Sequence, residues 1–462
     1  MTSWNALAPL LPLAMAALFL LLFGHLLKGG GGRSLAFLGA LACMASAALL
    51  VFVASRRGEA FGGLLRYDAL SAGLGVPILA AAVAALLLAP TYLARRGLDA
   101  GDFTALVLMA TLGLLLLVMA RELLTAILAL ETASVCLYAL TGYDRRRESS
   151  AEAALKYFLP GAVASALLLY GAACVYGATG ATRLEAHPGL ATPLGMLGAG
   201  LLLSGLAYKA GLVPFHGWLP DAYSGAPAPA TAYMAAAVKA GAFGILARLV
   251  VLGLPGNTAV LNALALAAVV TMTFGNLAGL AQTGLKRLLA YSAIAHSGYL
   301  MVGVVAAGRG GSTGPLVSYL LAYGLLTIGA FAAAGALEES ATGGLQIAQL
   351  RGLAKRRPLL SLGLAFCLLG LAGFPPTIGF LAKVSLFGEA YARGLTGLVV
   401  VAVLNSVVAL GYYLKPVVAM FMQEAPEGAE LPGQEPAGGA GVLAFACGFG
   451  GLVLGILPAI WM

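Results

Sequence analysis

Long apolar runs follow one another along almost the whole chain, with only short polar segments between them. A run of about twenty apolar residues is what an α-helix needs to cross the hydrocarbon core of a bilayer. On this criterion we count about fourteen membrane spans. They lie near residues 6–27, 34–55, 69–93, 103–120, 122–141, 153–176, 193–213, 227–252, 258–281, 287–306, 314–336, 359–391, 394–421 and 439–460. The pattern predicts an all-α integral membrane protein.

Proline interrupts two of these spans. The seventh span, 193–213, ends directly before Pro214. The twelfth, 359–391, is too long for one straight span and contains Pro375 and Pro376, so we expect two half-helices there. A broken backbone at membrane depth is tolerated only where protein or water satisfies its freed polar groups. Interrupted helices at matching places in two halves are typical of transporters built from inverted repeats.

The two breaks divide the chain into repeats. Spans four to eight, within 103–252, and spans nine to thirteen, within 258–421, would form two five-helix units. Because five is odd, one unit must be inverted in the membrane relative to the other. Three N-terminal spans within 1–100 precede the repeats, and one span at 439–460 follows them. We therefore expect residues 1–462 to form a single polytopic membrane domain.

Composition supports a membrane protein and excludes a soluble one. Hydrophobic residues make up 61% of the chain and charged residues only 10%. The formal net charge of +8 does not indicate nucleic-acid binding, because most Lys and Arg residues lie in short loops between spans. The apolar N-terminal segment lacks a basic flank and a small-residue cleavage site. We interpret it as the first span and not as a removed signal peptide.

The loop charges predict an orientation. If the N-terminus is outside, most loop Lys and Arg residues fall on the inner side, among them Arg145, Arg146 and Arg147. Cytoplasmic loops of membrane proteins carry such an excess. We therefore expect a multi-pass protein of the cytoplasmic (inner) membrane, with both termini outside.

Cysteine and histidine spacing gives no sign of a cofactor. The five cysteines are scattered without a CxxC or Cys–His spacing, so an iron–sulfur cluster or a zinc site is not expected. The four histidines include no pair on one helix face, which argues against haem. We expect no metal and no cofactor to be bound by this chain.

Three lysines lie inside predicted spans, two of them near the breaks. Lys209 precedes Pro214 by five residues, Lys239 is central in the eighth span, and Lys383 follows Pro376 by seven residues. A lysine at the centre of a span costs roughly 2.5–3.5 kcal/mol on insertion scales, and such residues usually line a polar path. We interpret all three as proton carriers, with Lys383 as the second-half counterpart of Lys209. The alternative for Lys209 is a static ion pair, and for Lys239 a lysine that snorkels to the interface.

One acid and one histidine complete the predicted site. Glu131 is central in the fifth span, and we expect it to face Lys209 and tune its proton affinity; the alternative is a protonated, structural Glu131. His296 is central in the tenth span, with Ser292 and Tyr299 on the same helix face. An imidazole with hydroxyl neighbours can pass protons near neutral pH, although a structural hydrogen bond is the alternative.

Three further residues are accessory candidates. Lys156 begins the sixth span after a basic loop, where snorkelling explains it equally well. His216 and Asp221 flank the first break, where they either gate access or cap half-helices.

Four segments carry a family resemblance. They are AALKYFLPGAVASALLLYGAACVYGATG, YKAGLVPFHGWLPDAYSGAPAPATAY, GLKRLLAYSAIAHSGYLMVG and LAGFPPTIGFLAKVSLF. Together with the residues around them, roughly 65–425, they resemble the subunit N family of bacterial NADH:quinone oxidoreductase, respiratory complex I. The DAYSGAP stretch, the histidine of the tenth span and the chain length favour this family over its larger antiporter-like paralogues.

The resemblance implies a fold and a set of site residues. It implies two inverted five-helix repeats with broken seventh and twelfth helices, and a central row of charged residues and water. Glu131, Lys209, Lys239 and Lys383 match the charged positions of the family, and His296 matches the histidine of its tenth helix.

The resemblance also implies partners. The chain would hold no redox centre, while NADH or another electron donor, flavin, iron–sulfur clusters and quinone would belong to other subunits of the complex. Its partners would be the lipid bilayer, an antiporter-like paralogue and small membrane subunits.

Our hypothesis is therefore a proton-translocating subunit, a translocase of the respiratory chain. Quinone reduction elsewhere would shift the pairing of Glu131 with Lys209, and protons would pass along Lys239 and His296 towards Lys383. One alternative is a subunit of a multisubunit cation/proton antiporter or a membrane-bound hydrogenase. Another is a channel or scaffold with inert charges. A self-contained redox enzyme is disfavoured by the missing cofactor motifs.

Overall fold

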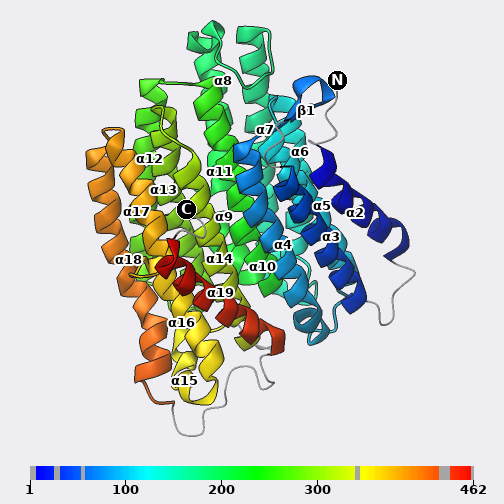
Figure 1. The fold of residues 1–462 in the computed structure, drawn as a ribbon, viewed down its shortest axis with the longest axis vertical. Helices are drawn as coiled ribbons and strands as arrows, with labels where there is room; N and C mark the ends of the chain where they lie inside the picture. The colour runs from blue at the N-terminus through cyan, green and yellow to red at the C-terminus, as the bar shows by residue number, and fades with distance from the viewer. Residues whose placement is uncertain (1–6, 25–31, 54–57, 339–343, 426–437, 459–462) are drawn as a thin grey trace.

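The protein is a bundle of long helices (Figure 1). The computed structural model describes residues 7–24, 32–53, 58–338, 344–425 and 438–458. Helices α2 (Leu11–Phe23) and α3 (Gly32–Phe52) lie on one flank of the bundle, and α17 (Ile378–Ala392) and α18 (Thr396–Met422) lie on the other.

The elements follow the predicted spans closely. The N-terminal part also contains η1 (Ala8–Leu10), β1 (Gly58–Ala60), η3 (Phe61–Gly63), β2 (Leu65–Tyr67) and α4 (Ala69–Ala94). The first predicted repeat contains α5 (Gly101–Met119), α6 (Leu123–Thr141), α7 (Glu148–Thr179), η4 (Pro188–Ala191), α8 (Pro193–Ala210), α9 (Trp218–Gly225), α10 (Ala228–Tyr233), η5 (Met234–Val238), α11 (Lys239–Arg248) and η6 (Leu249–Gly253). The rest contains α12 (Thr258–Leu280), α13 (Leu285–Gly308), α14 (Gly314–Leu337), η7 (Ile347–Leu350), α15 (Leu353–Arg356), α16 (Pro358–Ala372), α17, α18 and α19 (Gly438–Ile456).

The predicted membrane fold is confirmed. Within the described ranges, 11 helices are long and apolar enough to cross a bilayer, and the apolar helices Ala8–Phe23 and Pro358–Ala372 are shorter. The count of about fourteen spans stays a prediction. One small departure is the antiparallel pair β1–β2, in which Gly58 pairs with Tyr67 and Ala60 with Leu65. Its strands are three residues long, too short for the sequence pattern to reveal.

Both predicted helix breaks are present, and they share one local design. Helix α8 ends at Ala210, Gly211 takes a left-handed φ of 71°, and a cis peptide bond precedes Pro214. Helix α16 ends at Ala372, Gly373 has φ 84°, and a cis bond precedes Pro376. Glycine is the residue that adopts such a φ without strain. In both halves, then, a helix ends inside the bundle, and its last carbonyl groups have no hydrogen-bond donor from the helix itself.

The eighth predicted span is irregular. Between α10 and α11 lies the π-helical segment η5, and a second π-helical segment, η6, follows α11. Segments of this kind are frequent at functional sites. Lys239 is the first residue of α11, directly after η5.

The two halves meet in the centre of the bundle. In the most apolar stretch of each span, 94% of the residues are buried in α13, and 89% are buried in α14 and in the α10–η6 span. In α18 and α19 the buried share is 33%. Helix α19 crosses α14 and α16 obliquely in Figure 1, on the outside of the second half. Polar groups on α11 and α13 therefore lie inside protein and away from lipid.

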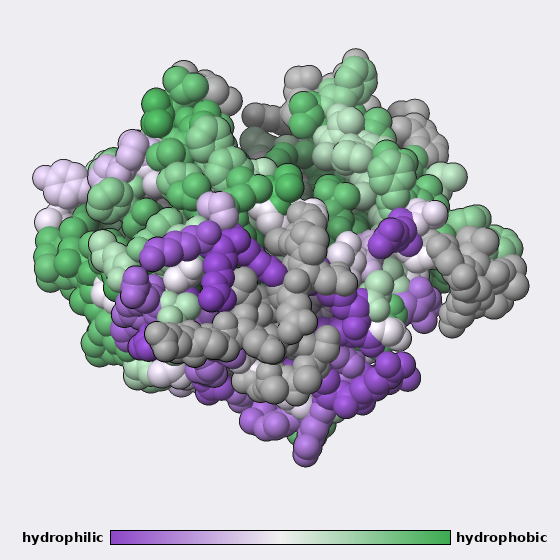
Figure 2. All heavy atoms as spheres, turned by 90° about the horizontal axis from the view of Figure 1, so that it is seen from below, coloured by the Kyte–Doolittle hydropathy of each residue, from purple (hydrophilic) through white to green (hydrophobic). Residues whose placement is uncertain are grey.

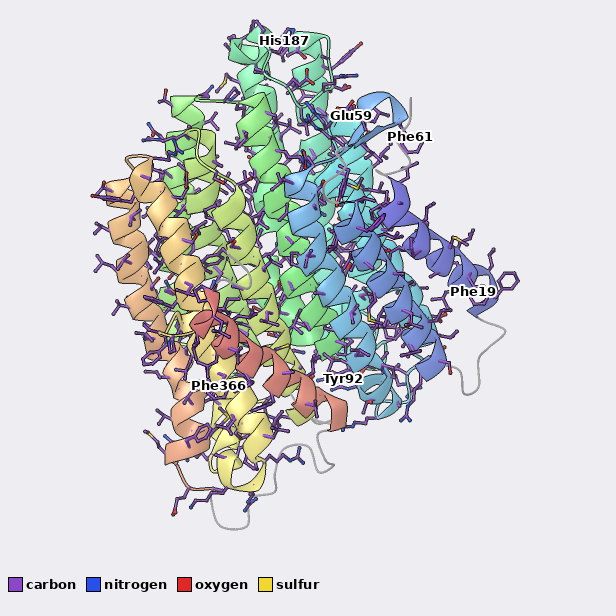
Figure 3. All side chains as sticks on the ribbon, viewed as in Figure 1. Phe19, Glu59, Phe61, Tyr92, His187 and Phe366 are labelled. Atoms are coloured by element: carbon purple, nitrogen blue, oxygen red, sulfur yellow. The ribbon has the colours of Figure 1, made fainter. Side chains whose placement is uncertain are left out.

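One end of the bundle carries the basic loops, and we call it the basic face. It is defined by Arg95, Arg96, Arg145, Arg146, Arg147, Lys286, Arg287, Arg351, Lys355, Arg356 and Arg357. Figure 2 shows hydrophilic residues gathered at this end, with hydrophobic residues around them. Figure 3 shows Tyr92 towards the same end and His187 at the opposite end.

Candidate functional site

Lys209 lies one residue before the end of α8 and points into the bundle. Its side chain is 1% exposed. Its Nζ donates to Ser134 Oγ at 2.7 Å and to the Tyr138 hydroxyl at 3.1 Å, both on α6. Glu131 Oε1 lies 3.8 Å from the same Nζ. The structure thus brings the expected acid and lysine together, with two hydroxyl groups beside them.

Glu131 is not fully buried. Its side chain is 30% exposed at the surface of the bundle, and Oε1 accepts a hydrogen bond from Ser165 Oγ on α7 at 2.7 Å. A separation of 3.8 Å is too long for a direct hydrogen bond to Lys209, so the two interact through charge. Such a contact is weaker than a direct charge-assisted hydrogen bond.

Lys239 is linked to the first break through a serine. Its Nζ donates to Ser297 Oγ at 2.6 Å and to the backbone oxygen of Ala293, both on α13. Ser297 Oγ in turn donates to the oxygen of Ala210 at 2.6 Å. Ala210 is the last residue of α8 and follows Lys209. Ser297 was not singled out from the sequence; the only signal was its place next to His296.

His296 is buried on α13 between two tyrosines. Nδ1 is 2.8 Å from the Tyr319 hydroxyl, and Nε2 is 3.1 Å from the Tyr413 hydroxyl. Ser292 hydrogen-bonds to Tyr413 and so reaches the histidine indirectly. The ring of Tyr299 stands edge-on to the imidazole at 5.6 Å. Ser292 and Tyr299 therefore both lie near His296. Its ring nitrogens, however, hydrogen-bond to Tyr319 and Tyr413, which the sequence did not indicate.

Lys383 lies after the second break and turns back towards it. Its Nζ donates to the oxygen of Ala372 at 2.8 Å and lies 5.0 Å from the Tyr299 ring centroid. The lysine is thus not at the position equivalent to Lys209, because the residue two before Gly373 is Leu371. The two lysines lie on opposite sides of their breaks, as their places in the sequence require, and their correspondence stays a prediction. In both halves a side chain instead caps the last carbonyl of the broken helix.

These side chains form a continuous row, which we call the central row: Glu131, Lys209, Lys239, His296 and Lys383. Tyr323 joins its middle, with its ring 5.3 Å from Lys239 Nζ and 4.8 Å from the imidazole. Within the described part of the chain, no ion pair involves Lys239 or Lys383. Glu131 at one end is therefore the acid that faces a row of basic groups.

The three accessory candidates do not join the central row. Lys156 is exposed and pairs with Glu152 at 2.6 Å and Asp221 at 3.2 Å, and Asp221 also binds Arg287 at 2.9 Å. These contacts tie α7, α9 and α13 together at the surface. The ring of His216 stands edge-on to Phe274 at 4.6 Å. Helix α9 has no side-chain cap, so these contacts are neither the snorkelling nor the capping considered in the sequence analysis, and an accessory role for the three residues stays a prediction.

A second charged cluster was missed by the sequence analysis. Glu338 follows α14, is 2% exposed in its side chain, and accepts a hydrogen bond from Tyr92 at 2.8 Å. Three cations surround it: Arg147 at 3.4 Å, Lys286 at 3.6 Å and Arg96 at 3.6 Å. Burial raises the pKa of Glu338, but the positive charges of Lys286 and Arg96 outweigh it and hold the pKa below the ordinary value. The cluster joins α4, α7, α13 and α14 at the basic face.

Metal ligands are not gathered in the described residues. Within those ranges no group of three His, Cys, Asp or Glu side chains is placed to hold a metal ion. The five cysteines are buried and free.

Comparison with known proteins assigns the family. The profile described as NADH:quinone oxidoreductase/Mrp antiporter, transmembrane, matches residues 120–409. The chain is 40% identical over 402 residues to NADH-quinone oxidoreductase subunit N of Bdellovibrio bacteriovorus, covering 84% of this chain and 82% of that protein.

Solved structures agree with this assignment. A chain of respiratory complex I from Thermus thermophilus matches with 38% identity and a TM-score of 0.85, over 98% of both chains. A chain of the Mrp complex from Dietzia sp. DQ12-45-1b has a TM-score of 0.84 over 99% of this chain and 95% of that one, but its 22% identity shows a shared fold alone. The protein thus belongs to the NADH:quinone oxidoreductase/Mrp antiporter family, and within it to the subunit N proteins.

Proposed function

We propose that this chain is a proton-translocating membrane subunit of an NADH:quinone oxidoreductase. The observation that carries the proposal is the central row, with four buried basic groups inside the bundle and one partly exposed acid at its end. Buried ionisable groups at membrane depth are costly and are typical of ion pathways. The 38–40% identity to complex I and subunit N proteins favours this function over a cation/proton antiporter or a hydrogenase.

In this mechanism the charge of Glu131 controls whether Lys209 is protonated. Two opposite unit charges 4 Å apart attract by about 4 kcal/mol at an effective dielectric constant of 20. The carboxylate at 3.8 Å therefore favours a protonated Lys209 against the cost of its burial. When Glu131 moves or is neutralised, this stabilisation is lost and Lys209 releases its proton.

The next steps follow the row. Lys239 has no carboxylate partner among the described residues, so no ion pair offsets the cost of burying its charge, and it can pass a proton on to the next group. The hydroxyl of Ser297 contacts Lys239 and the Ala210 carbonyl beside Lys209, so it holds Lys239 next to the first break. The carbonyl carries no proton, so transfer between the two amines would pass through water. His296 and its tyrosine partners lead from there to Lys383 and the second break.

Other subunits supply the driving reaction. In the proposed complex the electron donor, flavin, iron–sulfur clusters and quinone lie outside this chain, which occupies the bacterial inner membrane beside an antiporter-like paralogue and small membrane subunits. The basic face is the cytoplasmic one, because cytoplasmic loops carry the excess of Lys and Arg. Both termini would then lie outside.

The test is Lys209→Ala in the assembled complex, with Lys156→Ala as the control on an exposed lysine. We expect Lys209→Ala to slow proton pumping and coupled NADH oxidation by about tenfold or more, because a positioned proton carrier is removed. Lys156→Ala should retain both rates. Unchanged pumping in Lys209→Ala would favour the scaffold alternative.

A further inference from the structure

A groove opens on the outside of the bundle near the basic face, where α4, α14 and α19 meet. It holds about 420 Å³ of space, its open side included, and Phe331, Ala332 and Ala336 of α14 form its buried floor. Leu87 of α4 and Ala440 of α19 line its sides. Helix α19 crosses α14 obliquely in Figure 1, so it covers α14 only in part and leaves this space beside α4. The groove is therefore apolar inside and open on the lipid side of the bundle.

One face of α4 forms the long wall of the groove. Leu87, Thr91 and Arg95 lie one turn apart, and Leu88 and Tyr92 follow the same spacing, so all of them share one side of the helix. From Leu87 to Arg95 the helix rises about 12 Å. The hydrocarbon core of a bilayer is about 30 Å thick, so one leaflet contributes about 15 Å. The groove thus matches the depth of a single leaflet, with Arg95 at its polar end, and we call it the Arg95 groove.

Arg95 has no acidic partner in the described ranges. Its side chain is exposed, and no ion pair within those ranges involves it. A second guanidinium, that of Arg357 before α16, lies close enough to interact with it. Burial lowers the pKa of Arg357, and the positive charge of Arg95 lowers it further. Two arginines thus repel each other at the polar end of the groove, where an anion between them would be stabilised.

The inner wall of the groove adds positive charge. Tyr92 lines the groove, its hydroxyl donates to Glu338 at 2.8 Å, and Arg96 lies over its ring at 4.5 Å. Behind this ring three cations surround Glu338, and only Asp144 adds a second acid, so positive charge is in excess. Figure 3 shows Tyr92 beside the end of α19 nearest the basic face. The surroundings of the groove therefore favour a negatively charged ligand.

These features fit one kind of ligand. Guanidinium groups bind phosphate with good geometry, and basic pockets between membrane helices recognise the head groups of anionic lipids. A free phosphate would use only the polar end and leave the apolar floor uncovered. A neutral lipid would cover the floor and leave the arginines without an anion. An anionic phospholipid matches both parts of the groove at once.

We propose that the Arg95 groove binds one anionic phospholipid from the leaflet at the basic face. Its phosphate lies between Arg95 and Arg357, and one acyl chain lies along α4 over Phe331 and Ala336. The Thr91 hydroxyl, one turn deeper than Arg95, lies at the level of the ester groups. The site needs only the membrane placement of the chain and does not depend on the proposed function.

The first test uses a photoactivatable acyl chain in vesicles that contain the assembled complex. Anionic phosphatidylglycerol and zwitterionic phosphatidylethanolamine carry the same diazirine-bearing chain and are added in trace amounts. Mass spectrometry of the irradiated subunit measures cross-links to the α14 segment with Phe331 and Ala336. We expect about fivefold more cross-links from phosphatidylglycerol, the gain that one basic residue at a membrane surface gives to binding of an anionic lipid.

Arg95→Gln removes the charge at the polar end, with Arg145→Gln as its control. Arg145 is also an exposed arginine of the basic face, but it lies outside the groove. We expect cross-linking of phosphatidylglycerol to fall about fivefold in Arg95→Gln, to the level of phosphatidylethanolamine, and to persist in Arg145→Gln and in the charge-conserving Arg95→Lys. Cross-linking by phosphatidylglycerol that is equal in Arg95→Gln and wild type would overturn the proposal.

The second test fills the groove and leaves Arg95 in place. A Cβ atom at Gly439, which lines the groove, meets nothing within 4 Å, and the same holds for Gly450 on the same helix but outside the groove. Both positions therefore accept leucine. Gly439→Leu should lower cross-linking of both lipids about fivefold or more, because its side chain competes with the acyl chain for the same space, and Gly450→Leu should not. Wild-type cross-linking in Gly439→Leu would place the chain elsewhere.

The rival occupant is an acidic segment of the same chain. Glu427, Glu430 and Glu435 precede α19 in the sequence and lie outside the described residues. If the wild-type complex cross-links both lipids equally, these acids and not a lipid neutralise Arg95, and the proposal is wrong. A preference for phosphatidylglycerol that disappears in Arg95→Gln alone would establish the lipid as the ligand.

Discussion

At the scale of single residues, hydroxyl groups link the charges that the sequence reveals. Lys209, Lys239 and Lys383 can be recognised in the sequence because charge inside an apolar run is costly and rare. Ser297 and Tyr138 cannot, because an uncharged hydroxyl is tolerated in such a helix without a special partner, and serine often bonds to its own helix backbone. Only the packing of α13 against the end of α8 shows that Ser297 joins Lys239 to Ala210.

Ser297→Ala tests this link. It removes the hydroxyl that binds Lys239 Nζ and caps the Ala210 carbonyl, so we expect pumping by the assembled complex to fall about tenfold. Ser361→Ala on α16 is the control, because its buried hydroxyl has no hydrogen-bond partner among the described residues. Pumping rates in vesicles are the measurement, and similar rates in both variants would remove Ser297 from the path.

At the scale of elements, the prolines inside the apolar runs predict both helix breaks correctly. Pro214 and the Pro375–Pro376 pair cannot continue an α-helix, so the interruption follows from local chemistry. The π-helical segment η5 has no such signature in the sequence, since it consists of Met, Ala and Val residues that favour regular helix equally well. Its presence before Lys239 depends on tertiary packing around α10 and α11.

Helix α19 supports the second break through one glycine. A Cβ atom at Gly455 would lie 2.0 Å from the backbone oxygen of Pro376, so Gly455→Ala must push α19 away from the break. We expect a loss of about 1–3 kcal/mol in stability, as for overpacking in a core. Gly450→Ala on the same helix meets nothing within 4 Å and should be neutral or slightly stabilising.

Thermal unfolding of the purified complex, followed through this subunit, measures both α19 variants. A Gly455→Ala variant as stable as Gly450→Ala would show that α19 does not pack closely against the second break.

At the scale of the whole molecule, the Glu338 cluster holds both halves and the N-terminal helices together. Arg96 comes from the segment after α4, Arg147 precedes α7, and Lys286 is on α13. The sequence did not indicate this cluster, because its members are far apart along the chain and each lies at the end of a span, where charges are ordinary. Only the assembled bundle brings one acid to three cations.

Glu338→Gln should destabilise the subunit by about 3–5 kcal/mol, because it leaves buried cations without their acid. The control is Glu424→Gln, whose carboxylate is exposed and pairs with the exposed Lys355. Thermal unfolding at neutral pH measures the difference. Equal stability of the two variants would contradict the assigned role of the cluster.

The pH dependence of this stability has a definite sign. The pKa of Glu338 lies below its ordinary value in the folded protein, so its contribution is complete above the ordinary carboxyl pKa of about 4.3. It disappears as the pH falls through the lower, folded value. Wild type should therefore lose stability in acid more steeply than Glu338→Gln.

The central row is tested most directly at its middle, where Lys239 contacts Ala293 and Ser297 and does not contact Glu131. The measurement is the rate of proton pumping by vesicles that contain the complex with Lys239→Ala, beside the exposed-lysine variant Lys415→Ala. If protons travel along the row, Lys239→Ala loses pumping about tenfold or more although both ends are intact, and Lys415→Ala does not. Wild-type pumping by Lys239→Ala would contradict the account.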